Sequence, residues 1–234
     1  MNIMWIVMIT FVIGVFSNVL GGIIGYHRNK ESNNYIEPFT AGITTSIICF
    51  ELLMEAFEIG TKIYVVIFVI LGVILCLILN SLVKIFNISN KSTDLTVITS
   101  IMSTHNITEG MAIGAAFRIS KYLGMSLLLS VAIHNIPEGM IIGNIVKIEE
   151  SKKINILKSC TIIGVFLALG AVIGGVVGSF NRIYVMPSLA VSAGAMLYIV
   201  ACELIPEMSN YATNKKVGII YILGFLLGSL ICNI

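Results

Sequence analysis

Residues 103–111, STHNITEGM, are the stretch on which this chain is organised, because they recur at 132–140 as AIHNIPEGM. Both copies stand inside long apolar segments, and in each a His-Asn pair is followed by Glu four positions after the His. On a helix, positions i, i+1 and i+4 share one face, so each copy is expected to present a converging polar face. Two imidazoles and two carboxylates that face each other suit a divalent transition metal.

Both copies of the motif supply candidate metal ligands near the middle of an apolar segment. Ionisable groups at that depth are costly and usually mark function, and a divalent cation would balance two carboxylates there. Neutral His offers nitrogen, and Asn adds carbonyl oxygens. An alternative is that the polar side chains are hydrogen-bond bridges between helices, but the doubled motif favours metal binding. The candidate ligands are His105, Asn106, Glu109, His134, Asn135 and Glu138.

The composition is typical of a membrane protein, with 57% hydrophobic and only 11% charged residues. A membrane-spanning helix needs about 20 mostly apolar residues, and such runs recur along the chain. We therefore predict an all-α integral membrane protein, with residues 1–234 forming one polytopic domain. The net charge of +2 gives no reason to expect a nucleic-acid partner. The scattered cysteines contain no CxxC pair and are expected to be buried free thiols.

Eight spans are predicted, and the charged breaks between them predict the orientation. The first span is expected to be retained rather than removed as a signal peptide. Ten of the fourteen Lys and Arg residues fall in the odd-numbered loops, which predicts that these loops are cytoplasmic and that both termini lie outside. The spans are roughly 4–26, 38–58, 63–86, 95–117, 122–146, 157–180, 184–207 and 216–233.

Short matches indicate an internal repeat. Residues 13–16 and 163–166 both read IGVF, at an offset of 150. The Ala-Gly pairs at 41–42 and 193–194 each precede a Glu-rich stretch, ELLME at 51–55 and ELIPE at 203–207, at an offset of 152. Five spans separate each matching pair, so the two halves are expected to be inverted, as in many transporters. The predicted plan is a first repeat over about 4–86, a central helix pair over about 95–146, and a second repeat over about 157–233.

Two further carboxylate pairs, at i and i+4, are candidates for a cation pathway. The predicted orientation puts one pair toward the outer end of the second span and the other toward the cytoplasmic end of the seventh. Acidic side chains at both ends of a cation pathway would attract cations and pass them along it. For the residues nearest the span ends, a solvated helix end is an equally good explanation. The pathway candidates are Glu51, Glu55, Glu203 and Glu207.

These motifs resemble those of the ZIP (Zrt/Irt-like) family of divalent metal transporters, near its bacterial zinc-uptake members. The motifs at 105–110 and 134–139 are similar to those of the family's fourth and fifth helices, and 51–55 and 203–207 to those of its second and seventh. The resemblance implies eight helices in a three-plus-two-plus-three inverted repeat, both termini outside, and an elevator-like movement. It also implies uptake of Zn²⁺, Fe²⁺ or Mn²⁺, often by a homodimer.

The resemblance implies that the two His and two Glu residues form the primary metal site. It also implies that the two Asn residues lie toward a neighbouring second metal. The chain also departs from the family. Thr108 replaces a Pro of the fourth helix, and the third loop lacks a His-rich segment. The family's sixth helix carries a Glu just before a Leu-Gly-Ala run, where this chain has Leu167 and Ala168.

The sequence therefore predicts secondary, non-ATP transport of divalent metal ions into the cytoplasm across the plasma (cell inner) membrane. Zn²⁺ is the first expectation, and Fe²⁺, Mn²⁺, Co²⁺ and Cd²⁺ suit the same donors. No GxxxxGK[ST] pattern for nucleotide binding occurs. The alternatives are an intramembrane metalloenzyme, which would favour an HExxH motif that is absent, and a metal sensor, for which no soluble effector domain is seen. The expected partners are the metal ion, the lipid bilayer and a second copy of the chain.

Overall fold

The structure is a computed structural model that describes residues 2–27, 35–86, 95–209 and 215–232. The described residues form helices and connecting turns and contain no strand, which confirms the all-α prediction. Seven of their helical segments are long and apolar enough to cross a membrane. The helical segments are α1 (Ile3–His27), α2 (Ile36–Ile47) continued by a π-helix (Ile48–Leu53) and α3 (Met54–Ile59), α4 (Lys62–Phe86), α5 (Leu95–Ile119), α6 (Lys121–Ile148), α7 (Ile154–Phe180), a short 3₁₀ turn (Arg182–Tyr184), α8 (Val185–Ile199) continued by a π-helix (Val200–Leu204) and α9 (Ile205–Ser209), and α10 (Lys215–Cys232).

Each of the eight predicted ranges coincides with one of these rods. One long helix, α5, is not among the seven apolar segments, although it is as long as α1, at 25 residues. Its sequence carries one copy of the polar motif together with many hydroxyl side chains. Because α5 packs between α6 and α7 and beside α8, neighbouring helices cover those polar groups.

A very short connection places the two motif copies opposite each other. Ser120 alone separates α5 from α6, and its extended backbone ends one helix while its hydroxyl accepts a hydrogen bond from the backbone N–H of Leu123. A Ser at this N-cap position satisfies an otherwise free donor of the first turn. Two long helices joined so tightly must run antiparallel and side by side. The midpoints of α5 and α6, which hold the motifs, therefore lie at the same level.

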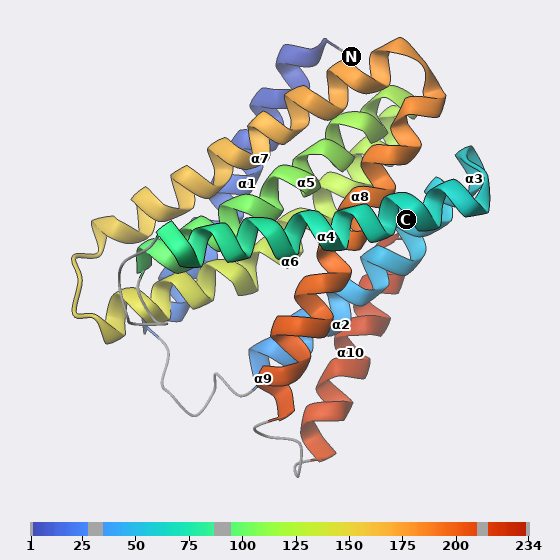
Figure 1. The fold of residues 1–234 in the computed structure, drawn as a ribbon. Helices are drawn as coiled ribbons and strands as arrows, with labels where there is room; N and C mark the ends of the chain where they lie inside the picture. Colours follow the sequence, from blue (N-terminus) through green and yellow to red (C-terminus); the bar gives the residue numbers. More distant parts are fainter. Residues whose placement is uncertain (1, 28–34, 87–94, 210–214, 233–234) are drawn as a thin grey trace.

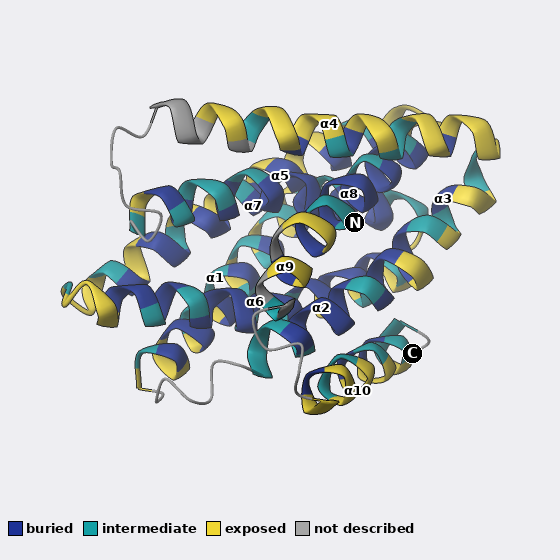
Figure 2. Cartoon of the chain, turned by 60° about the horizontal axis from the view of Figure 1, so that its bottom comes forward, coloured by how far each residue is buried: buried dark blue, intermediate teal, exposed yellow. Residues whose placement is uncertain are grey.

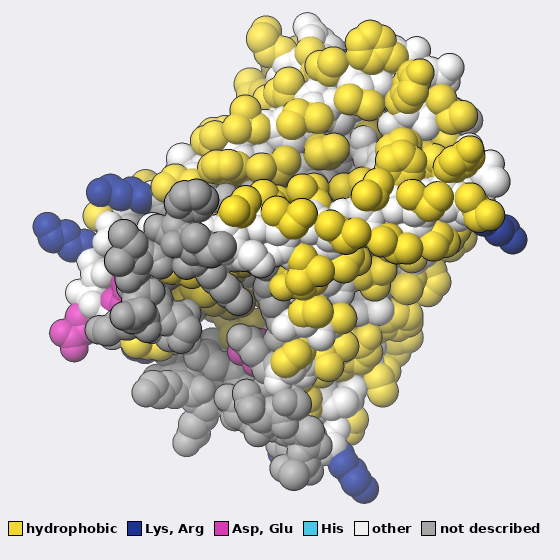
Figure 3. Space-filling view, viewed as in Figure 1, with side chains coloured by type: hydrophobic (Ala, Val, Ile, Leu, Met, Phe, Trp, Pro, Cys, Tyr) yellow, Lys and Arg dark blue, Asp and Glu magenta, His cyan; other side chains and the backbone are white. Residues whose placement is uncertain are grey.

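The helices pack as a four-helix group flanked by two further pairs. In the group, α1 packs on α6, α5 on α7, and contacts between α1 and α7 and between α5 and α6 close the ring. Outside it, α2 pairs with α10 and α4 pairs with α8 (Figure 1). The outward faces of α4 and α10 are largely exposed (Figure 2), and apolar side chains cover most of the face seen in Figure 3. Such an apolar exterior is expected of helices that face lipid.

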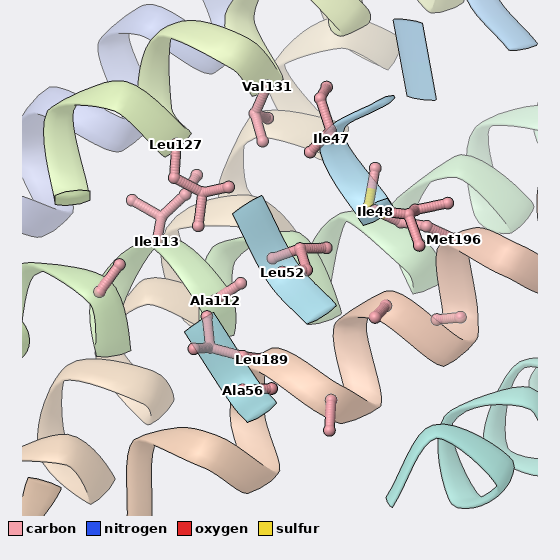
Figure 4. Close-up of a cluster of buried hydrophobic side chains, with 14 of the residues drawn as sticks. Ile47, Ile48, Leu52, Ala56, Ala112, Ile113, Leu127, Val131, Leu189 and Met196 are labelled. Atoms are coloured by element: carbon pink, nitrogen blue, oxygen red, sulfur yellow. The ribbon is translucent and has the colours of Figure 1, made fainter. Parts of the chain in front are cut away.

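The main apolar core joins the flanking helices to the four-helix group. Figure 4 shows the π-helical part of the α2 rod inserted between α5, α6 and α8, with Ile48 and Leu52 among the side chains of its neighbours. Ile113 of α5 and Leu127 of α6 contact this cluster and are at most 2% exposed. Packing of this kind holds the α2 rod against the helices that carry the motifs.

None of the five cysteines, all in the described part of the chain, forms a disulfide, but not all of them are buried. Cys76 and Cys160 are buried, whereas Cys49 and Cys202 are exposed on the helix surface. The prediction of burial is therefore wrong for these last two, and Cys232 is only partly buried. An apolar segment in a membrane can turn a thiol toward lipid as readily as toward protein, so hydropathy alone does not separate the two cases.

Glycines set the closest helix contacts, and the contacts of one helix pair recur in another. In each of them, a Cβ on the glycine would collide with a backbone carbonyl oxygen of the neighbouring helix. Between α1 and α6 these are Gly139 with Asn18 and Gly143 with Gly22; between α7 and α5 they are Gly110 with Leu167 and Gly114 with Ala171. The two sets correspond position by position. The residues of α7 lie 149 positions after those of α1, and the glycines of α5 lie 29 positions before those of α6. The IGVF match at an offset of 150 is thus one residue out of the packing register.

The flanking pairs show a second correspondence, at an offset of 152. Glycines of α2 and α10 approach each other's backbones, and so do glycines of α8 and α4. The contacts are Gly42 with Tyr221 and Gly224 with Phe39 in the first pair, and Gly194 with Val69 and Gly72 with Val191 in the second. The two π-helical stretches, which begin at Ile48 and Val200, also lie 152 residues apart. This agrees with the offset of the second pair of sequence matches.

Candidate metal centre

The midpoints of α5 and α6 bring four ionisable side chains together. Glu138 links both imidazoles, since its Oε1 lies 2.8 Å from His105 Nε2 and 2.9 Å from His134 Nε2. Glu109 approaches from α5, with its Oε1 3.4 Å from His134 Nε2. α6 runs through Pro137 without interruption, so the helix itself holds His134 and Glu138 one turn apart. The cluster joins side chains of both motif copies across the helix interface.

The spacing of these groups suits a single ion. His105, Glu109 and Glu138 each offer a ligand atom, and these three atoms lie within 4.8 Å of one another. Typical bonds to zinc from imidazole nitrogen and carboxylate oxygen are about 2.0–2.2 Å, so two ligands on opposite sides of an ion are separated by about 4 Å. In the described part of the chain this is the one group of three such residues found.

Electrostatics also favour a cation at this point. All four residues are at most 5% exposed, and neither oxygen of Glu109 accepts a hydrogen bond from a described residue. Two carboxylates that are removed from water and incompletely paired repel each other strongly. A divalent cation between them would neutralise both charges while the imidazole nitrogens complete its coordination.

The two motif asparagines lie beside the carboxylates and have unused polar atoms. Asn106 Nδ2 donates to the carbonyl of Met102 at 2.9 Å and to Glu138 Oε2 at 3.4 Å, while its Oδ1 has no partner among the described residues. Neither amide atom of Asn135 has one. Both residues are fully buried. Buried polar atoms without partners are uncommon and indicate a missing ligand or water.

A threonine of α2 orients one imidazole. Thr44 Oγ1 lies 2.8 Å from His134 Nδ1 and 2.9 Å from the carbonyl oxygen of Thr40. The hydroxyl proton is donated to that carbonyl, so Thr44 accepts the Nδ1–H of His134. The other ring nitrogen, Nε2, then presents its lone pair to the carboxylates. A partner on the distal nitrogen of this kind usually fixes the orientation of metal-binding histidines.

The pathway candidates do not join this cluster. Glu51 is buried in the π-helical part of the α2 rod and accepts a hydrogen bond from Ser126 of α6. Glu55 lies in α3 and is half-buried. The side chains of Glu203 and Glu207 lie outside the described residues, so their predicted place at the other mouth stays a prediction.

Sequence reasoning missed the polar residues that other helices bring to the centre. Thr44 belongs to no motif, although Thr40, Thr44 and Glu51 follow one another along the α2 rod at spacings of four and seven, a signal that could have identified it. Asn18 of α1, an amide in the middle of an apolar helix, is fully buried and also has an unpartnered Oδ1. Its burial was foreseeable, but its position beside α6 depends on helix packing.

Comparisons with known proteins match the part of the chain that carries the two motif copies. The family model described as ZIP zinc transporter matches residues 83–234, a range that includes both copies of the motif. The zinc transporter ZIPB of Bordetella bronchiseptica is 39% identical to this chain over 119 residues. That alignment covers 49% of this chain and 38% of the relative, so less than half of the relative's length is matched.

Proposed function

This chain belongs to the ZIP zinc transporter family, and from that premise we propose that it carries divalent metal ions, zinc first, across a membrane through the buried His/Glu centre. Members of the family are transporters and not enzymes, which removes the metalloenzyme alternative. The observation that carries the proposal is the convergence of His105, Glu109 and Glu138 at the midpoints of two buried helices, with His134 beside them.

The proposed ligands of the transported ion are the two imidazoles and two carboxylates, with Asn106 and Asn135 as neutral oxygen donors near it. Nitrogen and carboxylate donors in equal number suit Zn²⁺, and they also accept Fe²⁺, Mn²⁺, Co²⁺ and Cd²⁺. Zinc is placed first because the family model and the Bordetella relative are both described as zinc transporters.

A polar seam between α2 and α6 supports an entry route from the outer side. Glu51 bonds Ser126 at one end of the seam, and Thr44 bonds His134 at the other. Ser126, Ser130 and His134 follow one another at four-residue spacing, so they share a face of α6 about 12 Å long. A buried carboxylate at the outer end would attract the cation, and the hydroxyls would replace part of its hydration shell.

A hydroxyl-lined cavity of about 470 Å³ between α5 and α7 supports a release route on the opposite side. Its α5 wall reaches Ser103 and Thr104, directly before His105. The hydroxyl protons are donated to carbonyls of the same helix, so the oxygen lone pairs remain available to water or a hydrated cation. These intrahelical bonds are made by Thr99, Ser100, Ser103 and Thr104.

The proposed direction is inward, with both termini outside and the odd-numbered loops in the cytoplasm. The excess of Lys and Arg in those loops supports this orientation. The glycine contacts show that α1 runs parallel to α6 and that α5 runs parallel to α7. This is expected, because α1 and α6 are the first and fifth spans and α5 and α7 are the fourth and sixth, so each pair crosses the membrane in the same direction. The plasma (cell inner) membrane remains the predicted location.

We also propose the three-plus-two-plus-three inverted repeat as the plan of the chain. The constant offsets of the glycine contacts, 149 from α1 to α7 and 152 from α2 and α4 to α8 and α10, support it. The homodimer implied by the family resemblance remains a prediction, because the apolar outer faces of α4 and α10 suit lipid as well as a second copy.

Reconstitution into liposomes that enclose a zinc-sensitive dye tests the proposed function. Addition of external Zn²⁺ should produce a dye signal that saturates with concentration and is absent from protein-free liposomes. Glu109→Ala provides the inactive control, since it removes one of the two charges that balance the ion. Zinc binding without flux would support a sensor instead of a transporter.

A further inference from the structure

Asn18 is a polar residue of α1 that neither motif includes. It is fully buried, and its Nδ2 donates to the carbonyl of Gly14 at 3.0 Å. Its Oδ1 has no hydrogen-bond partner among the described residues. The side-chain N–H group thus bonds within its own helix, and the buried side-chain oxygen is left unsatisfied. This is unfavourable unless another group binds that oxygen.

The register of α1 against α6 places Asn18 at the level of the second motif copy. A Cβ at Gly139, directly after Glu138, would collide with the backbone carbonyl of Asn18. Because the two helices run parallel, Gly14 and Asn135 lie at about the same level one turn earlier. The hydrogen bond to Gly14 holds the Asn18 amide at this level, where both amide atoms of Asn135 also lack partners among the described residues.

The opposite wall of the four-helix group contributes no ligand. Leu167 of α7 occupies the packing position that corresponds to Asn18, against Gly110 and therefore next to Glu109. It is fully buried, and its side chain packs on Gly14. The two corresponding positions of α1 and α7 are thus an amide and an aliphatic side chain. A Leu cannot bind a cation, so the one polar oxygen that this pair offers comes from α1.

We propose that Asn18 Oδ1 is a further ligand for the transported ion, supplied from α1 where the family has an acid on α7. This inference rests on the proposed function and adds to it a residue and a chemical character. An amide oxygen completes the coordination of the ion without adding a third negative charge. The site so built holds two carboxylates, two imidazoles and neutral amides, which balances one divalent ion and leaves no charge for a second.

Zinc binding to the purified protein tests the role of Asn18 independently of flux. Titration with Zn²⁺ against a competing chelator gives the affinity, and the absorption spectrum of bound Co²⁺ reports the ligands. Asn18→Leu removes the oxygen and retains the size, whereas Asn18→Asp keeps an oxygen at the same place. Ser17→Ala is the matched control, because Ser17 is also buried but its hydroxyl donates to the carbonyls of Ile13 and Gly14.

Asn18→Leu should lower zinc affinity by about 10- to 100-fold, the usual effect of losing a group that supports a metal site, and should change the Co²⁺ spectrum. Asn18→Asp should retain binding, and Ser17→Ala should match the wild type. If Asn18→Leu does not fold, Asn18→Ala should show the same loss of zinc affinity and the same change in the Co²⁺ spectrum. A folded variant without the oxygen that binds zinc like the wild type would overturn this inference and leave the proposed function intact. Failure of the wild type to bind zinc would instead contradict the proposed function.

Discussion

Thr44 of α2 and His134 of α6 are 90 positions apart in the chain and meet at 2.8 Å, oxygen to Nδ1. The contact links the flanking helices to the metal-binding pair and determines which nitrogen of His134 faces the carboxylates. Because Thr44 donates its own proton to the Thr40 carbonyl, it can only accept from the ring. Nε2 of His134 is therefore left with a lone pair for the ion.

Thr44→Val should weaken zinc binding and flux about 10-fold, because His134 loses the acceptor that fixes its ring. The protein should remain folded, since the change conserves shape. Thr45→Val is the control: Thr45 follows directly in the same helix, but its hydroxyl bonds Ala41 and Tyr221 and does not contact the centre. Equal effects of the two substitutions in the liposome assay would show that Thr44 has no special role.

Glu138→Ala should abolish flux, because this carboxylate contacts both imidazoles and would supply half of the charge that balances the ion. Glu138→Gln, which keeps the shape and removes the charge, should be nearly as inactive. The measurement is initial dye response in liposomes with equal amounts of folded protein. Transport by either variant at a rate close to the wild type would mean that the ion binds elsewhere.

Gly139→Ala should destabilise the protein, because the new methyl group would meet the backbone of Asn18 and force α1 away from α6. Overpacking of this kind costs about 1–3 kcal/mol. Gly218→Ala is the matched control in α10, where a Cβ meets nothing within 4 Å. Thermal unfolding in detergent should show a clear loss for Gly139→Ala and no loss for Gly218→Ala. A stable Gly139→Ala protein would contradict the close packing of the two helices.

The two proposed routes predict opposite accessibility of introduced thiols. In a protein freed of its five native cysteines, Glu51→Cys should react with a membrane-impermeant reagent added outside. Ser100→Cys, which lines the cavity between α5 and α7, should react from inside. Labelling of intact and inverted vesicles separates the two sides. The reverse pattern would require the opposite orientation in the membrane.

One tightly bound ion per chain is expected at the centre. Two divalent ions side by side repel strongly away from water, and Glu109 and Glu138 are the only acids in the cluster that the described residues form there. Leu167, which stands where the family resemblance implies an acid, adds no charge. Anomalous diffraction from crystals soaked in Zn²⁺ would count the ions directly. Two ions at comparable full occupancy between α5 and α6 would contradict this expectation.

The sequence by itself determined the helical segments, because every predicted span except the fourth, α5, is strongly apolar and its backbone must be hydrogen-bonded internally. It also identified the two polar motifs, since paired His and Glu in apolar helices are costly and do not recur at equivalent places by composition alone. The offset of 152 likewise agrees with the packing of the flanking helices, because Gly42 and Gly194 make corresponding contacts in the two halves.

The tertiary structure alone decided how the motifs combine. The sequence predicted that the His and Glu of each copy converge and that the two copies face each other, but not that Glu138 contacts both imidazoles, including His105 across the interface. That pairing depends on how closely the helices approach, which backbone contacts at Gly110 and Gly139 control. It also brought Thr44 of α2 to His134 and the backbone of Asn18 in α1 to Gly139. Helical periodicity fixes which side chains share a face, but only packing between helices fixes which faces meet.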